Sequence, residues 1–78
     1  MERSDPSSIR RTLGRRVRHL RKTLGLSQEE LAQEVDLRQA QISELENGAN
    51  NITIDNLGRL ATALGVRACE LIDERIKD

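Results

Sequence analysis

Residues 24–48 read LGLSQEELAQEVDLRQAQISELENG, and no other part of the chain is as informative about the fold. Ser27 and Glu30 stand three residues apart and have the pattern of a capping box, which marks the start of a helix. Gly48 marks the end of a second helix, because glycine readily adopts the left-handed conformation that follows a last turn. The stretch therefore predicts two short helices, over residues 28–35 and 39–47, separated by a tight turn.

The remainder of the chain predicts three further helices. In its first third, apolar residues recur at spacings of 4, 4, 3 and 4, which gives one face of an amphipathic helix over residues 9–24. Thr53 is a helix-capping residue and Gly65 a helix stop, so they bound a fourth helix over residues 54–64. A fifth helix is predicted over residues 68–76. Because no segment alternates as a strand does, the predicted fold class is all-α, a compact domain of five helices.

The composition limits what the chain can be. With 78 residues it holds one domain, predicted as a flexible N-terminal tail over residues 1–8 and a helical domain over residues 9–78. The single cysteine, Cys69, excludes an internal disulfide, and no apolar run approaches the roughly 18 residues of a membrane span. We therefore expect a cytoplasmic protein with no membrane contact. The absence of Phe, Tyr and Trp argues against the stacking that holds single-stranded nucleic acid.

The net charge of zero conceals an uneven distribution along the chain. Residues 1–22 hold eight basic and two acidic residues, a net charge of +6. Residues 23–78 hold five basic and eleven acidic residues, a net charge of −6. One end of the molecule therefore suits contact with phosphates. A solvated, arginine-rich helix face explains the same pattern equally well.

The helix over residues 39–47 carries small and amide side chains on its outer face. With Ile42 and Leu45 toward the core, a 3.6-residue period turns four residues outward and leaves Gln39 at the edge. The four are Ala40, Ser43, Glu44 and Asn47. Glutamine can pair with adenine through two hydrogen bonds, and alanine can contact the thymine methyl group. The pattern therefore fits a helix-turn-helix, whose second helix enters the major groove of DNA.

Two helix starts carry arginine where an oxygen acceptor would satisfy unpaired N–H groups. Arg38 and Arg67 occupy these positions, at an expected cost of roughly 0.5–2 kcal/mol each for the missing cap. At Arg38 a bound phosphate or guanine edge would explain the arginine, whereas Arg67 has no such explanation. Arg21 and Glu46 lie at the inward edges of their helices, and we predict that they form a partly buried structural ion pair.

With these residues in view, a family resemblance can be stated. The sequence LGRRVRHLRKTLGLSQEELAQEVDLRQAQISELENG, followed by NNITIDNLGRLATALGV, resembles the phage repressor and Cro-like helix-turn-helix family, also called XRE-type. The resemblance covers about residues 13–72, and the short format with one helix after the core resembles the controller proteins of restriction–modification systems. It implies a lambda-repressor-like DNA-binding domain in a transcriptional regulator that binds an inverted-repeat operator of double-stranded DNA as a homodimer.

The resemblance and the outward face together assign roles to residues. The base-contacting set is Arg38, Gln39, Ala40, Ser43 and Glu44. The phosphate-contacting set is Arg10, Arg11, Gln28, Asn47, Asn50 and Asn51. The fifth helix would carry dimerisation, and the dimer-interface set is Leu71, Ile72 and Ile76. In the alternative interpretation, these three side chains close the core of the monomer. We expect no cofactor, no small-molecule ligand and no enzymatic activity, and one cysteine and one histidine at distant positions do not suggest a metal site.

Two features depart from the family pattern. The third helix has a single cation, Arg38, against Glu44 and Glu46, and Ala49 stands where related domains often have lysine or arginine. Phosphate affinity would therefore come mainly from the first helix. These departures keep a second interpretation open, namely a protein-interaction module of the antitoxin type with the same fold. Salt separates the two, because DNA binding weakens steeply with ionic strength and protein binding should depend on it less.

Overall fold

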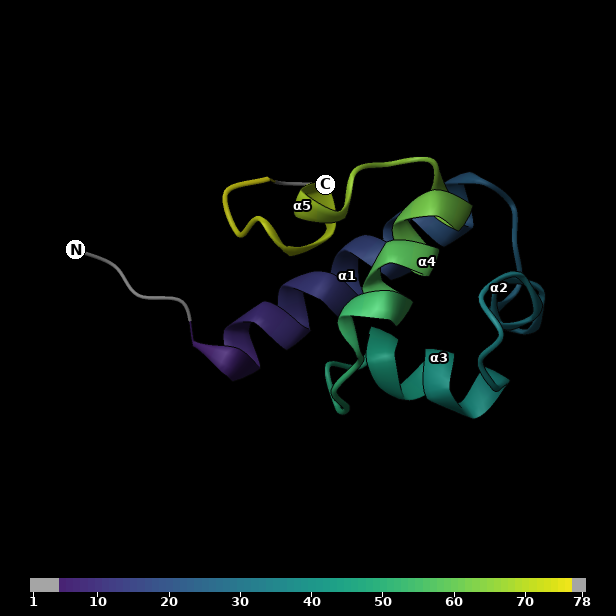
Figure 1. Ribbon diagram of the computed structural model, residues 1–78, viewed down its shortest axis with the longest axis horizontal. Coiled ribbons are helices and arrows are strands. Elements are labelled where there is room, and N and C mark those ends of the chain that lie inside the picture. The colour runs from purple at the N-terminus through teal and green to yellow at the C-terminus, as the bar shows by residue number, and fades with distance from the viewer. Residues whose placement is uncertain (1–4, 77–78) are drawn as a thin grey trace.

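The computed structural model describes residues 5–76, which contain five α-helices and no β-strand (Figure 1). Their bounds are α1 Pro6–Thr23, α2 Gln28–Glu34, α3 Gln39–Glu46, α4 Ile54–Leu64 and α5 Ala68–Ile72. In Figure 1, α1 runs through the middle of the molecule, α3 lies along the lower edge and α2 lies beyond one end of α3. Because α1 contacts α3, α4 and α5, it is the helix on which the others assemble. The predicted all-α fold class is confirmed.

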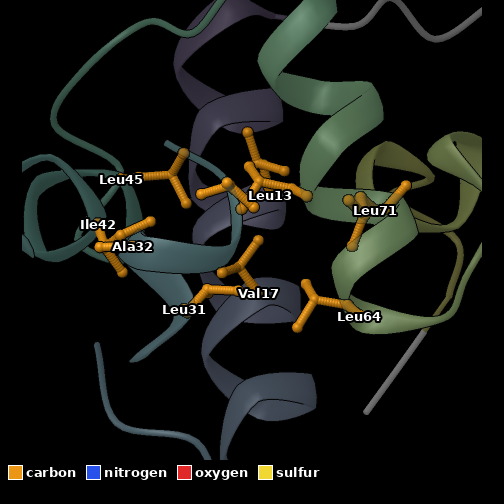
Figure 2. Close-up of a cluster of buried hydrophobic side chains, with 11 residues drawn as sticks. Leu13, Val17, Leu31, Ala32, Ile42, Leu45, Leu64 and Leu71 are labelled. Carbon is orange, nitrogen blue, oxygen red and sulfur yellow. The ribbon is translucent and has the colours of Figure 1, made fainter. Parts of the chain in front are cut away.

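The apolar core lies between α1 and the four shorter helices (Figure 2). All five helices contribute a side chain with no exposed surface, and these are Val17, Leu31, Ile42, Leu60 and Leu71. Burial of each such side chain contributes roughly 1.5–3 kcal/mol relative to full exposure. Leu37, Ile52 and Val66 precede the starts of α3, α4 and α5, and they pack against this core from its rim. These contacts fix the angle at which each helix enters the core.

α1 begins at Pro6, three residues before the start predicted from the apolar spacing. Asp5 caps the helix, since its Oδ2 accepts a hydrogen bond from the backbone N–H of Ser8 at 3.2 Å. Pro6 suits the first helical position because it has no N–H that needs a partner. Residues 6–8 of the predicted tail are therefore helical, while residues 1–4 lie outside the described residues.

α5 ends at Ile72, four residues before the predicted end. Asp73 adopts an extended conformation, and its carboxylate accepts hydrogen bonds from the backbone N–H and the guanidinium of Arg75, at 2.9 to 3.0 Å. This hydrogen-bonded turn replaces a further turn of helix. The Arg75 guanidinium also lowers the pKa of Asp73 to about 2. Ile76, predicted to lie on the fifth helix, therefore lies beyond its end.

α1 and α3 approach each other closely at Gly14. A side-chain carbon at that position would lie 2.4 Å from the backbone oxygen of Leu45 and 2.8 Å from that of Glu46. Since only glycine fits there, the backbone of α1 packs directly on the last turn of α3. Gly48 follows the end of α3. It has a left-handed φ of 71°, and its N–H donates to the Leu45 carbonyl at 3.0 Å. The two glycines set the position and the length of α3.

Candidate nucleic-acid interface

A tight turn connects α2 to α3. The backbone N–H of Leu37 donates to the carbonyl of Ala32 at 3.0 Å, and Asp36 adopts a left-handed φ of 56°. α3 starts after Arg38, whose backbone N–H donates to Gln41 Oε1 at 2.9 Å. Within the described residues, no side chain accepts a hydrogen bond from the first N–H groups of α3. The positive end of this helix therefore remains available to an anion such as a phosphate.

A series of hydrogen bonds connects α1 to the first residue of α3. Arg21 Nε and Nη2 donate to the Glu46 carboxylate at 2.6 and 3.0 Å, and both residues are buried. Gln28 Nε2 donates to Glu46 Oε1 at 3.1 Å, and Gln39 Nε2 donates to Gln28 Oε1 at 2.6 Å. The hydrogen bond to Glu46 raises the pKa of Arg21. The predicted Arg21–Glu46 ion pair is confirmed, and through Gln28 it also holds Gln39.

The outer face predicted for α3 lies at the surface of the molecule. Its exposed members are Arg38, Gln39, Ala40, Glu44 and Asn47, with Ser43 half-buried. On the opposite side of the helix, Ile42 and Leu45 are buried in the core. One surface therefore presents an amide, a methyl group and a carboxylate, which are groups that read the edges of bases.

Candidate phosphate contacts lie at both ends of α3. Arg10 Nη1 donates to Asn51 Oδ1 at 3.3 Å, which joins the start of α1 to the loop after α3. Arg11 is exposed and packs beside Gly48, where a side-chain carbon would lie 3.2 Å from Arg11 Cγ. Gln28 lies at the other end, beside the first residue of α3. The structure thus brings residues far apart in the sequence to the two flanks of one helix.

The two asparagines that follow α3 have different surroundings. Asn51 is exposed and contacts Arg10. Asn50 is half-buried, and its Nδ2 lies 3.4 Å from the Gln41 carbonyl oxygen and 3.4 Å from Glu44 Oε1. The other amide atom of Asn50, Oδ1, is buried. The Asn50 side chain therefore faces α3 and connects the helix backbone to the Glu44 carboxylate.

The residues predicted for a dimer interface differ in exposure. Leu71 has no exposed surface because it packs in the core between α1, α4 and α5, so the prediction that it meets a partner is wrong. Ile72 is 36% exposed, and Ile76 is half-buried. Sequence analysis missed Ile54, which is 80% exposed at the first position of α4. The sequence could have indicated this exposure. Ile52 and Leu57 are the apolar residues that pack around the start of α4, and Ile54 is not one of them.

Other kinds of site find little support in the described part of the chain. Residues 5–76 hold no group of three or more His, Cys, Asp or Glu side chains that could bind a metal ion. None of the helices within that range is long and apolar enough to cross a membrane. Cys69 is an exposed free thiol. The candidate residues converge on α3 and its flanks.

This arrangement defines a class of protein. Two short helices joined by a tight turn, of which the second exposes polar groups between candidate phosphate contacts, form a helix-turn-helix DNA-binding domain. Comparison with known sequences gives the particular family. The chain belongs to the HTH_3 helix-turn-helix family, whose pattern matches residues 17–71.

Individual relatives agree with this assignment. Control protein C.BamHI of Bacillus amyloliquefaciens is 40% identical over 68 residues, which cover 86% of this chain and 84% of that protein. The crystal structure of the hypothetical transcription factor NHTF from Neisseria has a TM-score of 0.80 and 37% identity, with 91% of this chain and 80% of that chain covered.

The restriction–modification controller protein C.AhdI from Aeromonas hydrophila is also similar in structure. Its TM-score is 0.75 at 39% identity, with 80% of this chain and 94% of that chain covered. The predicted XRE-type family and lambda-repressor-like fold are confirmed, as is the similarity to controller proteins. The chain is a helix-turn-helix DNA-binding transcriptional regulator.

Proposed function

We propose that this protein is a sequence-specific regulator of transcription that acts in the cytoplasm and binds an inverted-repeat operator as a homodimer. The observation that carries the proposal is the exposed polar row on α3, with Gln39 hydrogen-bonded to Gln28 at its start. A side chain that is held in place before binding loses less conformational entropy when it meets a base. Relatives named as control proteins and as a transcription factor support the same function.

Base selection belongs to the exposed side of α3. Gln39 can pair with adenine N6 and N7, Ala40 can contact a thymine methyl group, and Glu44 can accept a hydrogen bond from cytosine N4. Each good pair discriminates against a wrong base by about 1–3 kcal/mol. Arg38 and Ser43 complete the set, with the Arg38 guanidinium suited to guanine O6 and N7.

Phosphate contacts set the register of the protein on the duplex and carry no sequence information. Arg10 with Asn51, and Arg11 beside Gly48, supply them at one flank of α3. Gln28 supplies them at the other flank, and Asn47 belongs to the same set at the exposed end of the helix. Asn50 takes a different part, because its amide is directed at α3 and its Nδ2 lies beside Glu44.

The charge of this surface favours a homodimer. Arg38 is the only cation among residues 37–49, which include α3, and the exposed Glu44 carboxylate repels phosphates. One copy therefore has few cationic contacts and a correspondingly low affinity. Two copies related by a twofold axis double these contacts and read two half-sites about one DNA turn apart, roughly 34 Å.

Selection from random duplex DNA tests the proposal. We expect enrichment of an inverted repeat, and we expect Gln39→Ala and Glu44→Ala each to lose preference at one base pair per half-site. Gln33→Ala and Glu34→Ala are matched controls, because these exposed α2 residues are not among the proposed base contacts. Unchanged preference in both α3 variants would overturn the base assignments. If folded, dimeric protein enriched no sequence, the protein-interaction module would be favoured instead.

A further inference from the structure

A surface next to the candidate DNA contacts combines a protruding apolar side chain with an apolar hollow. Ile54, the first residue of α4, is 80% exposed. It stands on the rim of a hollow of about 310 Å³. The other apolar residues that line this hollow are Pro6, Ile9, Leu13, Ile52, Leu57 and Ile72. Ile54 and these six residues, drawn from α1, α4, α5 and the loop before α4, are called the Ile54 surface below.

We propose that a second copy of this chain occupies the Ile54 surface, with Ile54 of each copy seated in the hollow of the other. The proposal rests on the homodimer of the proposed function and names the contact that builds it. It moves the centre of the interface from α5, where the sequence placed it, to the start of α4. Ile72 stays in the interface as part of the lining of the hollow.

The Ile54 surface is complementary to itself. A twofold axis requires one patch to serve both partners, so a projection and its receptor must lie on the same surface. The Ile54 surface satisfies this requirement, because the isoleucine and the aliphatic hollow are adjacent on one copy. A single exposed isoleucine is ordinary. An exposed isoleucine beside an apolar hollow is different, because a second copy of the chain presents the same hollow to that isoleucine.

Charged side chains near Ile54 also favour a second copy of this chain. Asp55 and Arg59 lie one turn apart on α4, and both line a neighbouring hollow that Ile54 also borders. When two copies of α4 cross antiparallel at a twofold axis, the acidic residue of one copy faces the basic residue of the other. Arg59 Nη1 donates to the neutral Asn56 side chain at 2.8 Å, so that hydrogen bond leaves its charge uncompensated. The rim thus carries both signs needed for an ion pair across the axis.

The Ile54 surface lies next to candidate DNA contacts. Arg10 and Asn51, the hydrogen-bonded pair of candidate phosphate contacts, line the same hollow. In Figure 1 the start of α4 lies next to the end of α3, joined to it by a short loop. Pairing through the Ile54 surface therefore keeps both sets of phosphate contacts close to the axis, where a single duplex reaches both half-sites.

Sedimentation equilibrium on matched variants tests the proposal. Ile54→Asn removes the projection, and Leu24→Asn is the control, since Leu24 is 52% exposed at the end of α1 and does not line the hollow. Ile54→Asp is a second variant that should stay folded, because an acidic residue at the first position of a helix is favourable. Both Ile54 variants should weaken dimerisation about 100-fold or more, because each dimer loses two buried isoleucines. Leu24→Asn should dimerise as the wild type does.

Binding to two duplexes separates this inference from the proposed function. Ile54→Asn should bind a single half-site as tightly as the wild type and lose the extra affinity for the inverted repeat. The inference is overturned if this variant dimerises as tightly as the wild type, or if the wild type is monomeric at micromolar concentration. If the wild type binds no duplex at all, the proposed function fails, and sedimentation still decides whether the Ile54 surface is the dimer contact.

Discussion

Among single residues, Glu46 has the most demanding environment. Its side chain is 2% exposed, and the carboxylate accepts hydrogen bonds from Arg21 and Gln28. Removing a charge from water costs free energy, and the cost is offset only when partners of good geometry surround it. Glu46 meets this condition, and in doing so it fixes α1 against α3 and aligns Gln28 with Gln39.

Loss of one member of this ion pair should therefore be severe. Arg21→Ala leaves the Glu46 carboxylate buried without its cation, and we expect the free energy of unfolding to fall by about 3–5 kcal/mol in urea denaturation. Arg18→Ala, at an exposed position on α1, is the control and should change it by less than about 0.5 kcal/mol. Equal effects of the two substitutions would show that the pair does not carry this stability.

The adjacent asparagines after α3 should give different binding defects. Asn51→Ala removes a group paired with Arg10 and should weaken binding to every duplex by a similar factor. Asn50→Ala frees the Glu44 carboxylate and should reduce discrimination at the base pair that Glu44 reads. Affinities for a panel of single-base operator variants measure both effects. If Asn50→Ala still altered discrimination in a Glu44→Ala background, Asn50 would not act through Glu44.

At the level of whole helices, the starts of the helices differ in their caps. α2 has a reciprocal capping box, in which Ser27 N–H donates to Glu30 Oε1 at 2.8 Å and Glu30 N–H donates to Ser27 Oγ at 3.0 Å. α3 and α5 have only half of such a box, since Gln41 and Glu70 accept from the backbone N–H of an arginine. The arginine offers no oxygen in return, so two helix starts are less stable than they could be.

Serine substitutions distinguish a functional arginine from a tolerated one. Arg38→Ser and Arg67→Ser each supply the missing acceptor and should raise the free energy of unfolding by about 0.5–2 kcal/mol, as thermal denaturation will show. We expect only Arg38→Ser to weaken operator binding, because Arg67 lies at the start of α5, away from α3. Equal DNA affinity of the two variants would remove Arg38 from the contact set.

Helix-end carboxylates should make the protein sensitive to acid. Hydrogen bonds from Ser27 lower the pKa of Glu30 below 4.5, and the Arg75 guanidinium lowers that of Asp73 from 3.8 to about 2. Because these folded-state values lie below the unfolded ones, their contribution is present above about pH 5 and is lost as the pH falls toward 2. Glu30→Gln keeps an acceptor oxygen but no longer titrates. Its melting temperature should therefore fall less between pH 5 and 3 than that of the wild type.

At the level of the whole molecule, charge is segregated along the chain. Residues 1–22 carry a net charge of +6 and residues 23–78 one of −6. The basic segment includes α1, whose first turns place Arg10 and Arg11 beside the end of α3. The acidic remainder disfavours contact with DNA elsewhere, so we expect electrostatic attraction to orient the molecule with this end toward the duplex.

Salt dependence measures how many phosphates this end neutralises. With Arg10 and Arg11 contributing in each copy of a dimer, the logarithm of the binding constant should fall with the logarithm of salt concentration at a slope of about −4. Arg10→Ala should bring the slope to about −2, because each dimer loses two contacts. Titrations of the operator duplex at several salt concentrations give the slopes. An unchanged slope in the variant would show that Arg10 does not meet a phosphate.

Local sequence patterns were enough to predict five helices and the inner and outer faces of α3. Capping residues and glycine stops mark helix ends through hydrogen bonds between near neighbours, and apolar spacing is a property of a single helix. For this reason residues 24–48 predicted α2 and α3 to within a residue or so, and the outer face of α3 with them. The Arg21–Glu46 pair was also predictable, because each residue breaks the apolar pattern at the inner edge of its own helix.

Other contacts between residues far apart in the sequence follow from the packing of the helices. The contact of Arg10 with Asn51 and the inward turn of Asn50 depend on how α1 packs against the loop after α3. The full burial of Leu71 and the exposure of Ile54 depend on how α4 and α5 lie on α1. Local patterns cannot supply these relations, because burial and contact across the chain are set by the summed packing of all five helices rather than by the spacing within any one.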